Sequence, residues 1–256
     1  MKSLKAIYFQ KYNVIWGMAF ALFFMIGWEA AFRFKILNPI FISSPSEIFG
    51  VLPRMFVEDQ FATAIMVSLQ ETILGLSLAI FIGIFMGIIM GWYRFFSAFL
   101  GPFVNAFNST PRIALLPLFI IWFGLGMEAK VVIIFLSALF PMLVNTQTGF
   151  SKIDPNLIRV ARAYGANDIV LFGTVGLPSA FPYMLAGLRL AIARGLVGMV
   201  VAEMFAGQQG LGYVIAIAGA TLQTSKLMAS VAFVALFGIV MTELVRIFEK
   251  RFASWG

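Results

Sequence analysis

The chain has 256 residues, of which 61% are hydrophobic and only 11% are charged. Soluble domains carry about a quarter charged residues, so this composition excludes an ordinary soluble protein and predicts an all-α membrane protein. The net charge is +7, but the basic residues are scattered along the chain, so we expect no nucleic-acid binding. The chain contains neither Cys nor His, so we expect no disulfide, no metal, no cofactor and no catalytic residue in it.

Apolar stretches that cross ~30 Å of hydrocarbon need around 20 residues. The first candidate follows three lysines and superficially resembles a signal peptide, but it is longer than a signal core and no cleavage site comes after it. We interpret it as a retained span, and the whole chain, 1–256, as a single transmembrane domain. About six spans are predicted, at 14–32, 67–91, 96–123, 130–150, 186–206 and 227–248.

Basic residues orient these spans, because Lys and Arg gather in cytoplasmic loops. An inside N-terminus places ten basic residues in the cytoplasmic segments and five outside, which predicts a multi-pass protein of the bacterial cytoplasmic membrane with both termini in the cytoplasm. The inside set is Lys2, Lys5, Lys11, Arg94, Lys152, Arg159, Arg162, Arg246, Lys250 and Arg251, and the outside set is Arg33, Lys35, Arg54, Lys130 and Lys226.

Two loops are expected outside. In the loop at 33–64, Ser46 followed by Glu47 indicates the start of a short surface helix. The loop at 207–226 is rich in glycine, but its stretch from Gly207 to Gly212 lacks the Lys-Ser/Thr of a P-loop. We therefore expect a flexible loop there, and we expect any ATPase to be a separate chain.

The second span carries a small residue at every fourth position. Residues at i and i+4 share a helix face, and small ones let two helix backbones approach closely. The pattern predicts a packed helix bundle rather than a ligand site. The stripe consists of Gly75, Ala79, Gly83, Gly87 and Gly91.

The third span is interrupted by Pro111, Arg112 and Pro117. Proline removes a backbone donor and clashes with the preceding turn, so we expect either a kinked span or two broken pieces. Non-helical backbone at this depth lies against protein or a water-filled path.

A polar interruption at 151–183 separates the fourth and fifth spans on the cytoplasmic side. Asp154 is placed to cap a helix that begins at Pro155 and ends before Gly165. Asn167 is placed to cap a second short helix to about Gly173, and we expect Pro178 to stop any helical stretch after it. Arg159 and Arg162 lie off the apolar face of the first helix, which consists of Leu157, Val160, Ala161 and Tyr164 at i, i+3, i+4 and i+7. This face either packs on its own bundle or the membrane surface, or docks into a groove on a soluble partner.

The same segment resembles the EAA loop of ABC importer permeases. In that family, Glu-Ala-Ala is followed by three residues, Gly, nine residues and Ile-x-Leu-Pro. The spacing here is identical, although Arg159 replaces Glu and Val160 replaces Ala. The matching segments are Arg159-Val160-Ala161, Gly165 and Val175-Gly176-Leu177-Pro178.

Further segments resemble the nitrate/sulfonate/taurine subgroup of these permeases. They extend over nearly the whole chain and keep the subgroup's order. They are the run from Thr110 to Leu118, Trp122-Phe123-Gly124-Leu125-Gly126, the run from Leu185 to Leu190, Ala202-Glu203 and Gly210-Leu211-Gly212-Tyr213.

The resemblance implies a type I importer. Two permease copies, as a homodimer, would form the pathway in the lipid membrane, two subunits would bind ATP and Mg, and an external solute-binding protein would deliver a small anionic solute. Relatives handle sulfonates, taurine, nitrate, bicarbonate, aromatic carboxylates, and pyrimidine or flavin precursors. The loop from Asp154 to Pro178, which we call the coupling loop, would contact the ATPase through Asp154, Leu157, Arg159, Val160, Ala161, Arg162, Tyr164, Gly165, Ala166, Leu177 and Pro178.

Several charged residues lie in or near the spans, where charges are costly and mark pathways or ion pairs. Arg194 and Glu203 lie on opposite faces of the fifth span, and Arg189 and Glu203 are about 21 Å apart along its axis, so each needs a partner on another helix or at an interface. Arg112 could contact substrate or could pair with Glu71 or Glu203. The candidate pathway residues are Arg112, Glu71, Arg189, Arg194 and Glu203.

Two other functions are consistent with a membrane protein. A membrane enzyme would have to assemble its chemistry from scattered carboxylates. A stand-alone channel or ion-coupled secondary transporter would explain the charged residues in the spans, but it would leave the coupling loop without a role.

Overall fold

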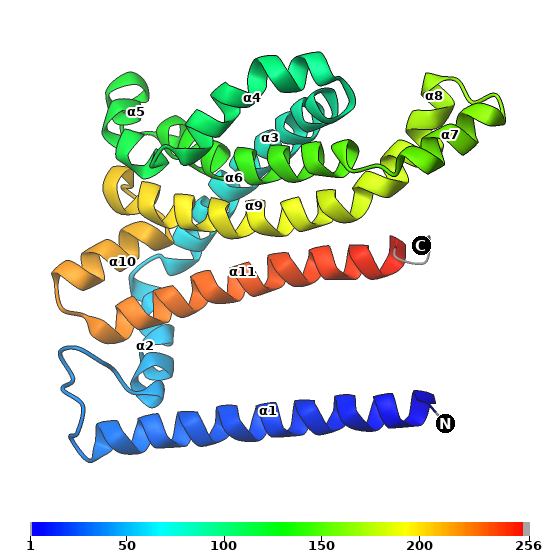
Figure 1. Ribbon diagram of the computed structural model, residues 1–256. Helices are drawn as coiled ribbons and strands as arrows, with labels where there is room; N and C mark the ends of the chain where they lie inside the picture. The colour runs from blue at the N-terminus through cyan, green and yellow to red at the C-terminus, as the bar shows by residue number, and fades with distance from the viewer. Residues whose placement is uncertain (1, 253–256) are drawn as a thin grey trace. The chain divides into compact units, whose positions relative to one another are not determined.

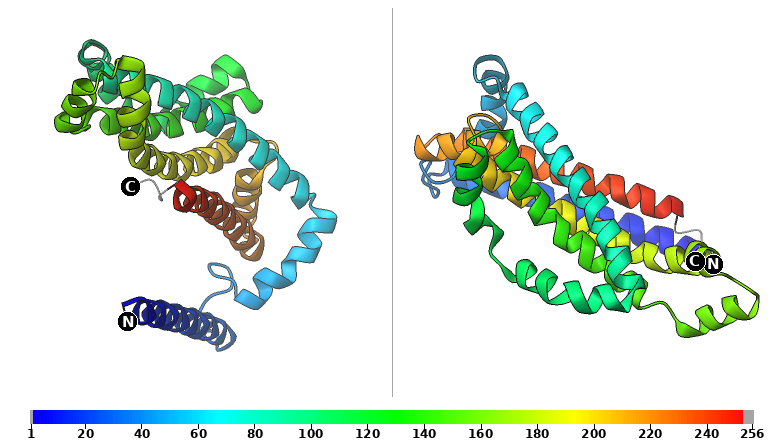
Figure 2. Two further views of the ribbon diagram at one scale, coloured as in Figure 1. Left: turned by 90° about the vertical axis from the view of Figure 1, so that its right-hand side faces the viewer. Right: turned by 90° about the horizontal axis from the view of Figure 1, so that it is seen from above.

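The computed structural model describes residues 2–252, with side chains described from 15 to 250, and this part of the chain is helical with no strand. The all-α prediction is confirmed. The chain divides into two compact units, residues 1–61 with 215–231 and residues 62–214 with 232–256. The elements are drawn in Figure 1, and two further views are given in Figure 2.

The helices differ widely in length, and those of the predicted coupling loop are among the shortest. They are α1 (Lys2–Arg33), α2 (Pro45–Glu58), α3 (Phe61–Trp92), α4 (Arg94–Ser109), the 3-10 turn η1 (Arg112–Leu115), α5 (Leu116–Phe123), α6 (Met127–Ser151), α7 (Pro155–Ala163), α8 (Asp168–Leu171), the π-helical turn η2 (Phe172–Gly176), α9 (Leu177–Ala206), α10 (Leu211–Ala220) and α11 (Thr224–Phe252).

Five stretches within these helices are long and apolar enough to cross a membrane, and a sixth span is possible if α4 and η1–α5 count together. These two pieces meet at an angle of 84°. Thr110 and Pro111 adopt extended backbone at the break, where proline cannot continue a helix. Of the two forms expected for the third span, the broken one is found.

The start of the fifth span was predicted too late. The helix begins at Leu177 rather than near residue 186, and Pro178 lies in its first turn, directly after the π-helical turn η2. The expectation that Pro178 stops a helix is therefore wrong. The second short helix also ends earlier than predicted, at Leu171, and the chain continues through η2 directly into α9.

In the first unit, serine side chains connect the end of α1 to the start of α2. Ser46 donates to the Glu29 carboxylate from its N–H (3.1 Å) and from its hydroxyl (2.8 Å). Ser44 caps α2 by accepting from the Glu47 N–H. The short surface helix expected near Ser46 is thereby confirmed.

In the second unit, the small-residue face of α3 packs on α6. A Cβ added at Gly87 would lie 2.6 Å from the Thr146 Cβ, and one at Gly91 would lie 2.6 Å from the Phe150 Cβ. Ala79 is fully buried. The predicted packing role of the stripe agrees with these contacts.

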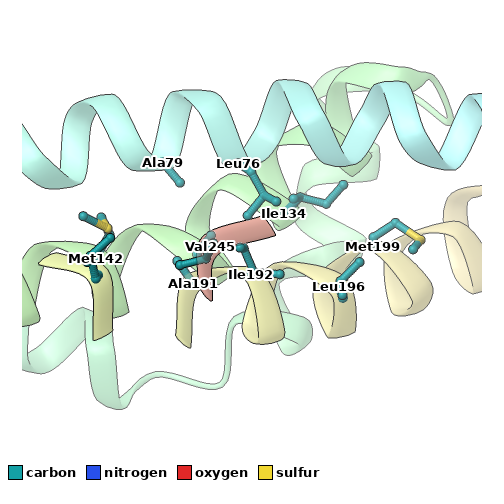
Figure 3. Close-up of a cluster of buried hydrophobic side chains, with 11 residues drawn as sticks. Leu76, Ala79, Ile134, Met142, Ala191, Ile192, Leu196, Met199 and Val245 are labelled. Atoms are coloured by element: carbon teal, nitrogen blue, oxygen red, sulfur yellow. The ribbon is translucent and has the colours of Figure 1, made fainter. Parts of the chain in front are cut away.

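A second small-residue face, on α9, packs on the same helix. α6 and α9 lie side by side (Figure 1). Added Cβ atoms at Gly198 and Gly187 would lie 2.7 Å from the Ser137 Oγ and 2.8 Å from the Asn145 Cβ. Leu76 and Ala79 of α3 point toward Ile134 and toward side chains of α9 in the resulting core (Figure 3).

The loop expected at 207–226 contains a helix, α10, and that expectation is corrected. Gly210 adopts a positive φ of 114°, which glycine tolerates, and α10 begins at the next residue.

Gly87→Val should destabilise the bundle, because its side chain would overlap Thr146 and the Leu143 carbonyl. We expect the unfolding free energy to fall by about 1–3 kcal/mol, measured by thermal unfolding of the purified permease in detergent. Gly101→Val is the matched control, because a Cβ at Gly101 meets nothing within 4 Å. Equal stability of the two variants would contradict the packing assigned to Gly87.

Candidate functional site

The coupling loop projects beyond the ends of α6 and α9 as the pair α7–α8 (Figures 1 and 2). Its first helix begins as the sequence indicates. The Asp154 carboxylate accepts from the Asn156 N–H at 2.8 Å, and Pro155 occupies the first turn. The predicted cap is confirmed.

Gly165 ends α7 in a Schellman motif. The Gly165 N–H donates to the Arg162 carbonyl at 2.9 Å, and the Ala166 N–H donates to the Ala161 carbonyl at 3.0 Å. Gly165 has a φ of 82°, which is costly for residues with a side chain. The glycine is therefore needed for the sharp turn between the two short helices.

The second helix is joined to the first by side chains. Asn167 caps α8 by accepting from the Val170 N–H at 2.9 Å. Arg162 donates to the Ala166 carbonyl and pairs with Asp168. The two short helices therefore hold a fixed geometry, and Arg162 acts within the loop.

The apolar face of α7 is largely uncovered. Leu157, Val160 and Tyr164 are 50%, 55% and 89% exposed, and Ile169 on α8 adds a side chain that is 82% exposed. Ala161 is half-buried. We call the four exposed side chains the apolar patch. Arg159 is also exposed and donates to Asn156 at 2.7 Å, while Leu177 and Pro178 lie in the first turn of α9.

Aromatic rings join the coupling loop to the bundle. Phe172 of η2 stacks on Phe150 of α6, with ring centroids 5.5 Å apart and planes within 9°, and Trp92 of α3 meets both rings edge-on. A Cβ at Gly176 would lie 2.7 Å from the Trp92 ring. These contacts were not predicted, because the three rings come from separate segments.

Two of the candidate pathway residues, Glu71 and Glu203, are buried in polar contacts. Glu71 pairs with Lys130, and both side chains are almost fully buried. Lys130, which was counted among the outside basic residues, lies in the first turn of α6 and pairs across to α3. The alternative pairing of Arg112 with Glu71 is not found.

Glu203 is fully buried and holds the start of α10. Its carboxylate accepts from the Ser68 hydroxyl and from the Gly212 N–H, both at 2.7 Å. The Ser68 Oγ also accepts from the Leu211 N–H at 2.8 Å. Helix starts leave N–H groups without partners, and this cluster satisfies two of them. The contacts give Glu203 a positioning role, and its place on a pathway stays a prediction.

The remaining intramembrane arginines have different surroundings. Arg189 of α9 pairs with Glu249 of α11 at 2.7 Å, so its partner lies on another helix as predicted. Arg112 donates to Asn108 and lies over the Phe140 ring, whereas Arg194 is exposed on α9.

Glu71→Gln should destabilise the protein, because it leaves the Lys130 ammonium buried without a counter-ion. We expect a loss of about 3–5 kcal/mol of unfolding free energy, measured by thermal or denaturant unfolding. The double variant Glu71→Leu/Lys130→Met removes both charges and should recover most of the loss. A double variant no more stable than Glu71→Gln would refute the pairing.

Glu203→Gln should loosen the start of α10, because Ser68 and Gly212 donate to different carboxylate oxygens and the amide replaces one of these with an NH2 group, which cannot accept. We expect amide hydrogen exchange at Leu211 and Gly212 to be roughly 10–100-fold faster, as measured by mass spectrometry. Ser68→Ala should likewise speed amide exchange at these two residues, because its hydroxyl accepts from the Leu211 N–H. Ser230→Ala is the control, because that buried hydroxyl donates within α11. Unchanged amide exchange in Glu203→Gln would contradict the positioning role of Glu203 at the start of α10.

Comparison with known sequences identifies the family. A family model described as "binding-protein-dependent transport system inner membrane component" matches residues 79–254. The putative aliphatic sulfonates transport permease protein SsuC of Escherichia coli (strain K12) is 31% identical over 229 residues, which are 90% of this chain and 87% of that protein. The taurine transport system permease protein TauC of the same strain is 29% identical over 240 residues, 92% of this chain and 87% of that protein.

Solved structures agree on the fold. A chain in the crystal structure of an amino acid ABC transporter with histidines superimposes with a TM-score of 0.63 at 17% identity, covering 78% of this chain and 97% of that chain. A chain of the inward-facing MetNI methionine ABC transporter superimposes with a TM-score of 0.55 at 23% identity, covering 73% of this chain and 95% of that chain. This chain therefore belongs to the binding-protein-dependent transport family and is one of its multi-pass inner membrane permease components.

Proposed function

We propose that this permease moves a small anionic solute into the cytoplasm, and that ATP hydrolysis on separate subunits docked at the coupling loop drives the movement. The apolar patch on α7 and α8 carries the proposal. Exposed apolar side chains on a projecting polar segment are costly in water and mark a contact surface.

An ATP-binding subunit is the partner that fits this patch. A short helix with one apolar face docks into a groove, with its anchors one turn apart. Leu157, Val160 and Tyr164 have this spacing along α7 and its C-cap, and α8, after the Schellman turn at Gly165, carries Ile169 as a further exposed apolar side chain. ATP and Mg would be held by the partner, because the sequence has no P-loop.

The path from the coupling loop into the membrane supports a mechanical role. Ile158 of α7 packs against the cluster around Phe150 and Ala180, and η2 passes into α9 without a linker. A displacement of α7 would therefore move α9 as a rigid body rather than being absorbed by a flexible segment. ATP binding would then bias one of two packed arrangements of the membrane helices.

The family supports a proposal for the rest of the assembly. A second copy of this chain would complete the pathway, both termini would lie in the cytoplasm, and an external binding protein would present the solute. Taurine and aliphatic sulfonates, the solutes named for the relatives, carry a sulfonate group, which favours an anion as the solute of this chain.

The test is co-purification with the candidate ATPase. Val160→Asp and Gly165→Val should each abolish it, because one places a charge in the patch and the other forces a β-branched side chain into a positive φ. Ala163→Asp is the matched control, because it adds the same charge to an exposed position of α7 outside the patch. The proposal would be supported if both variants lose co-purification of the ATPase and Ala163→Asp retains it. Failure of the wild-type chain to bind the ATPase would favour the stand-alone transporter.

A further inference from the structure

We propose that Arg112 and Arg194 together form an anion-binding site inside the membrane part of the permease, with the sulfonate class of oxyanion as its ligand. The inference rests on the proposed function, since it names where along the pathway the anionic solute is held. Both residues belong to the second unit.

The two arginines lie deep and at the same level. Arg194 is twelve residues before the end of α9 and seventeen after its start, about 18 Å and 26 Å along the axis. Its neighbour Gly195 faces Ala138 of α6, and the Arg112 guanidinium lies 4.9 Å from the centre of the Phe140 ring, two residues further along α6. The charge of Arg194 acts on the Arg112 guanidinium, so the two like charges repel each other.

Neither arginine has a counter-ion in the described part of the chain. All eleven Asp and Glu residues have described side chains, and seven of them pair with other basic residues. Glu47, Asp154 and Glu203 accept hydrogen bonds from Ser43, Asn156, and Ser68 with Gly212, respectively. The last one, Glu128, lies beside Gly126 at the start of α6. None forms an ion pair with Arg112 or Arg194 in the described part of the chain.

The guanidinium groups keep unused hydrogen-bond donors. The Nη2 group of Arg112 donates to the carbonyl and side-chain oxygens of Asn108, both at 2.7 Å. Its Nε is buried and has no hydrogen-bond partner. Asn108 and the Phe140 ring are both neutral, so they orient the side chain without cancelling its charge. Arg194 has no hydrogen bond or ion pair among the described residues.

Exposure on a spanning helix indicates which environment Arg194 faces. Its neighbours on α9, Leu190 and Val197, are also exposed, at 51% and 54%. A charge at mid-helix does not face hydrocarbon, so this strip of α9 faces a water-filled path or a second copy of the chain. Arg194 lies far from either end of α9, and Arg112 lies at the same level, whereas the phosphate of a lipid lies at the membrane interface. A lipid phosphate is therefore not the ligand that we propose.

Two uncompensated guanidinium groups at one level match a small oxyanion. A guanidinium presents a rigid planar fork of donors that suits the oxygens of a sulfonate or carboxylate. The broken backbone at Thr110 and Pro111 places Arg112 beside the bundle without a continuous helix. A solute bound between the two would neutralise part of their charge and leave again when the helices shift.

The experiment measures anion binding by the full-length permease, co-expressed with its ATPase. Methanesulfonate is titrated against chloride at constant ionic strength, and thermal unfolding reports binding. Dimethyl sulfone, a neutral molecule of similar shape, is the ligand control. We expect methanesulfonate alone to stabilise the wild type. Arg112→Gln and Arg194→Gln should each raise its apparent Kd roughly 10–100-fold. Arg246→Gln, which removes an exposed arginine paired with Glu243, should leave it unchanged.

Charge-preserving variants keep the test decisive if a Gln variant does not fold. Arg112→Lys and Arg194→Lys should still bind methanesulfonate, but more weakly than wild type, because an ammonium lacks the fork. Wild-type affinity in either Gln variant would overturn the proposal. So would a wild type that responds equally to dimethyl sulfone, or one with no methanesulfonate response, which would point to a carboxylate of the second copy as the counter-ion. ATPase co-purification is scored in the same samples, so failure of the coupling proposal is seen separately from failure of the anion site.

Discussion

Close packing of α6 between two glycine faces is the constraint on which the second unit depends. Gly87 and Gly91 of α3 and Gly187 and Gly198 of α9 bring three backbones together at distances where no side chain fits. In hydrocarbon there is no water to expel, so helices associate through such contacts and through buried polar pairs. The Glu71–Lys130 pair and the Glu203 cluster add the second kind of contact at the same helices. The three helices therefore form one rigid body.

Because these helices are closely packed, a movement of the coupling loop would be transmitted to them. α7 and α8 are fixed to each other by the Schellman turn and Arg162, and they are fixed to α3 and α6 by the rings of Trp92, Phe150 and Phe172. No flexible linker separates η2 from α9. A force applied to the apolar patch would therefore reach the helix that carries Arg194, and docking and solute release could be parts of one movement.

Features determined by neighbouring residues in the sequence could be predicted, and features determined by distant residues could not. Capping by Asp154 and Asn167, the turn at Gly165 and the α3 stripe each depend on residue types at short spacing, and all were predicted. The continuation of α9 through Pro178 depends on whether proline falls in a first turn or an interior one, which local sequence leaves open. The partners of Glu71 and Glu203 lie on other helices, so their identity depended on packing. α10 was missed because the glycines around it suggested a loop, whereas Glu203 and Ser68 hold its start.

Protection of the apolar patch by a bound ATPase is the most direct test of this account. The natural chain has no Cys, so Val160→Cys gives a single reactive thiol at a 55% exposed position. Labelling by a membrane-impermeant maleimide should be fast in the isolated permease and at least roughly tenfold slower in the complex with its ATPase, because a docked thiol is inaccessible. Ala163→Cys, at an exposed position of α7 outside the patch, should label at similar rates in the isolated permease and in the complex. Equal labelling of Val160→Cys with and without a bound ATPase would contradict docking at this face.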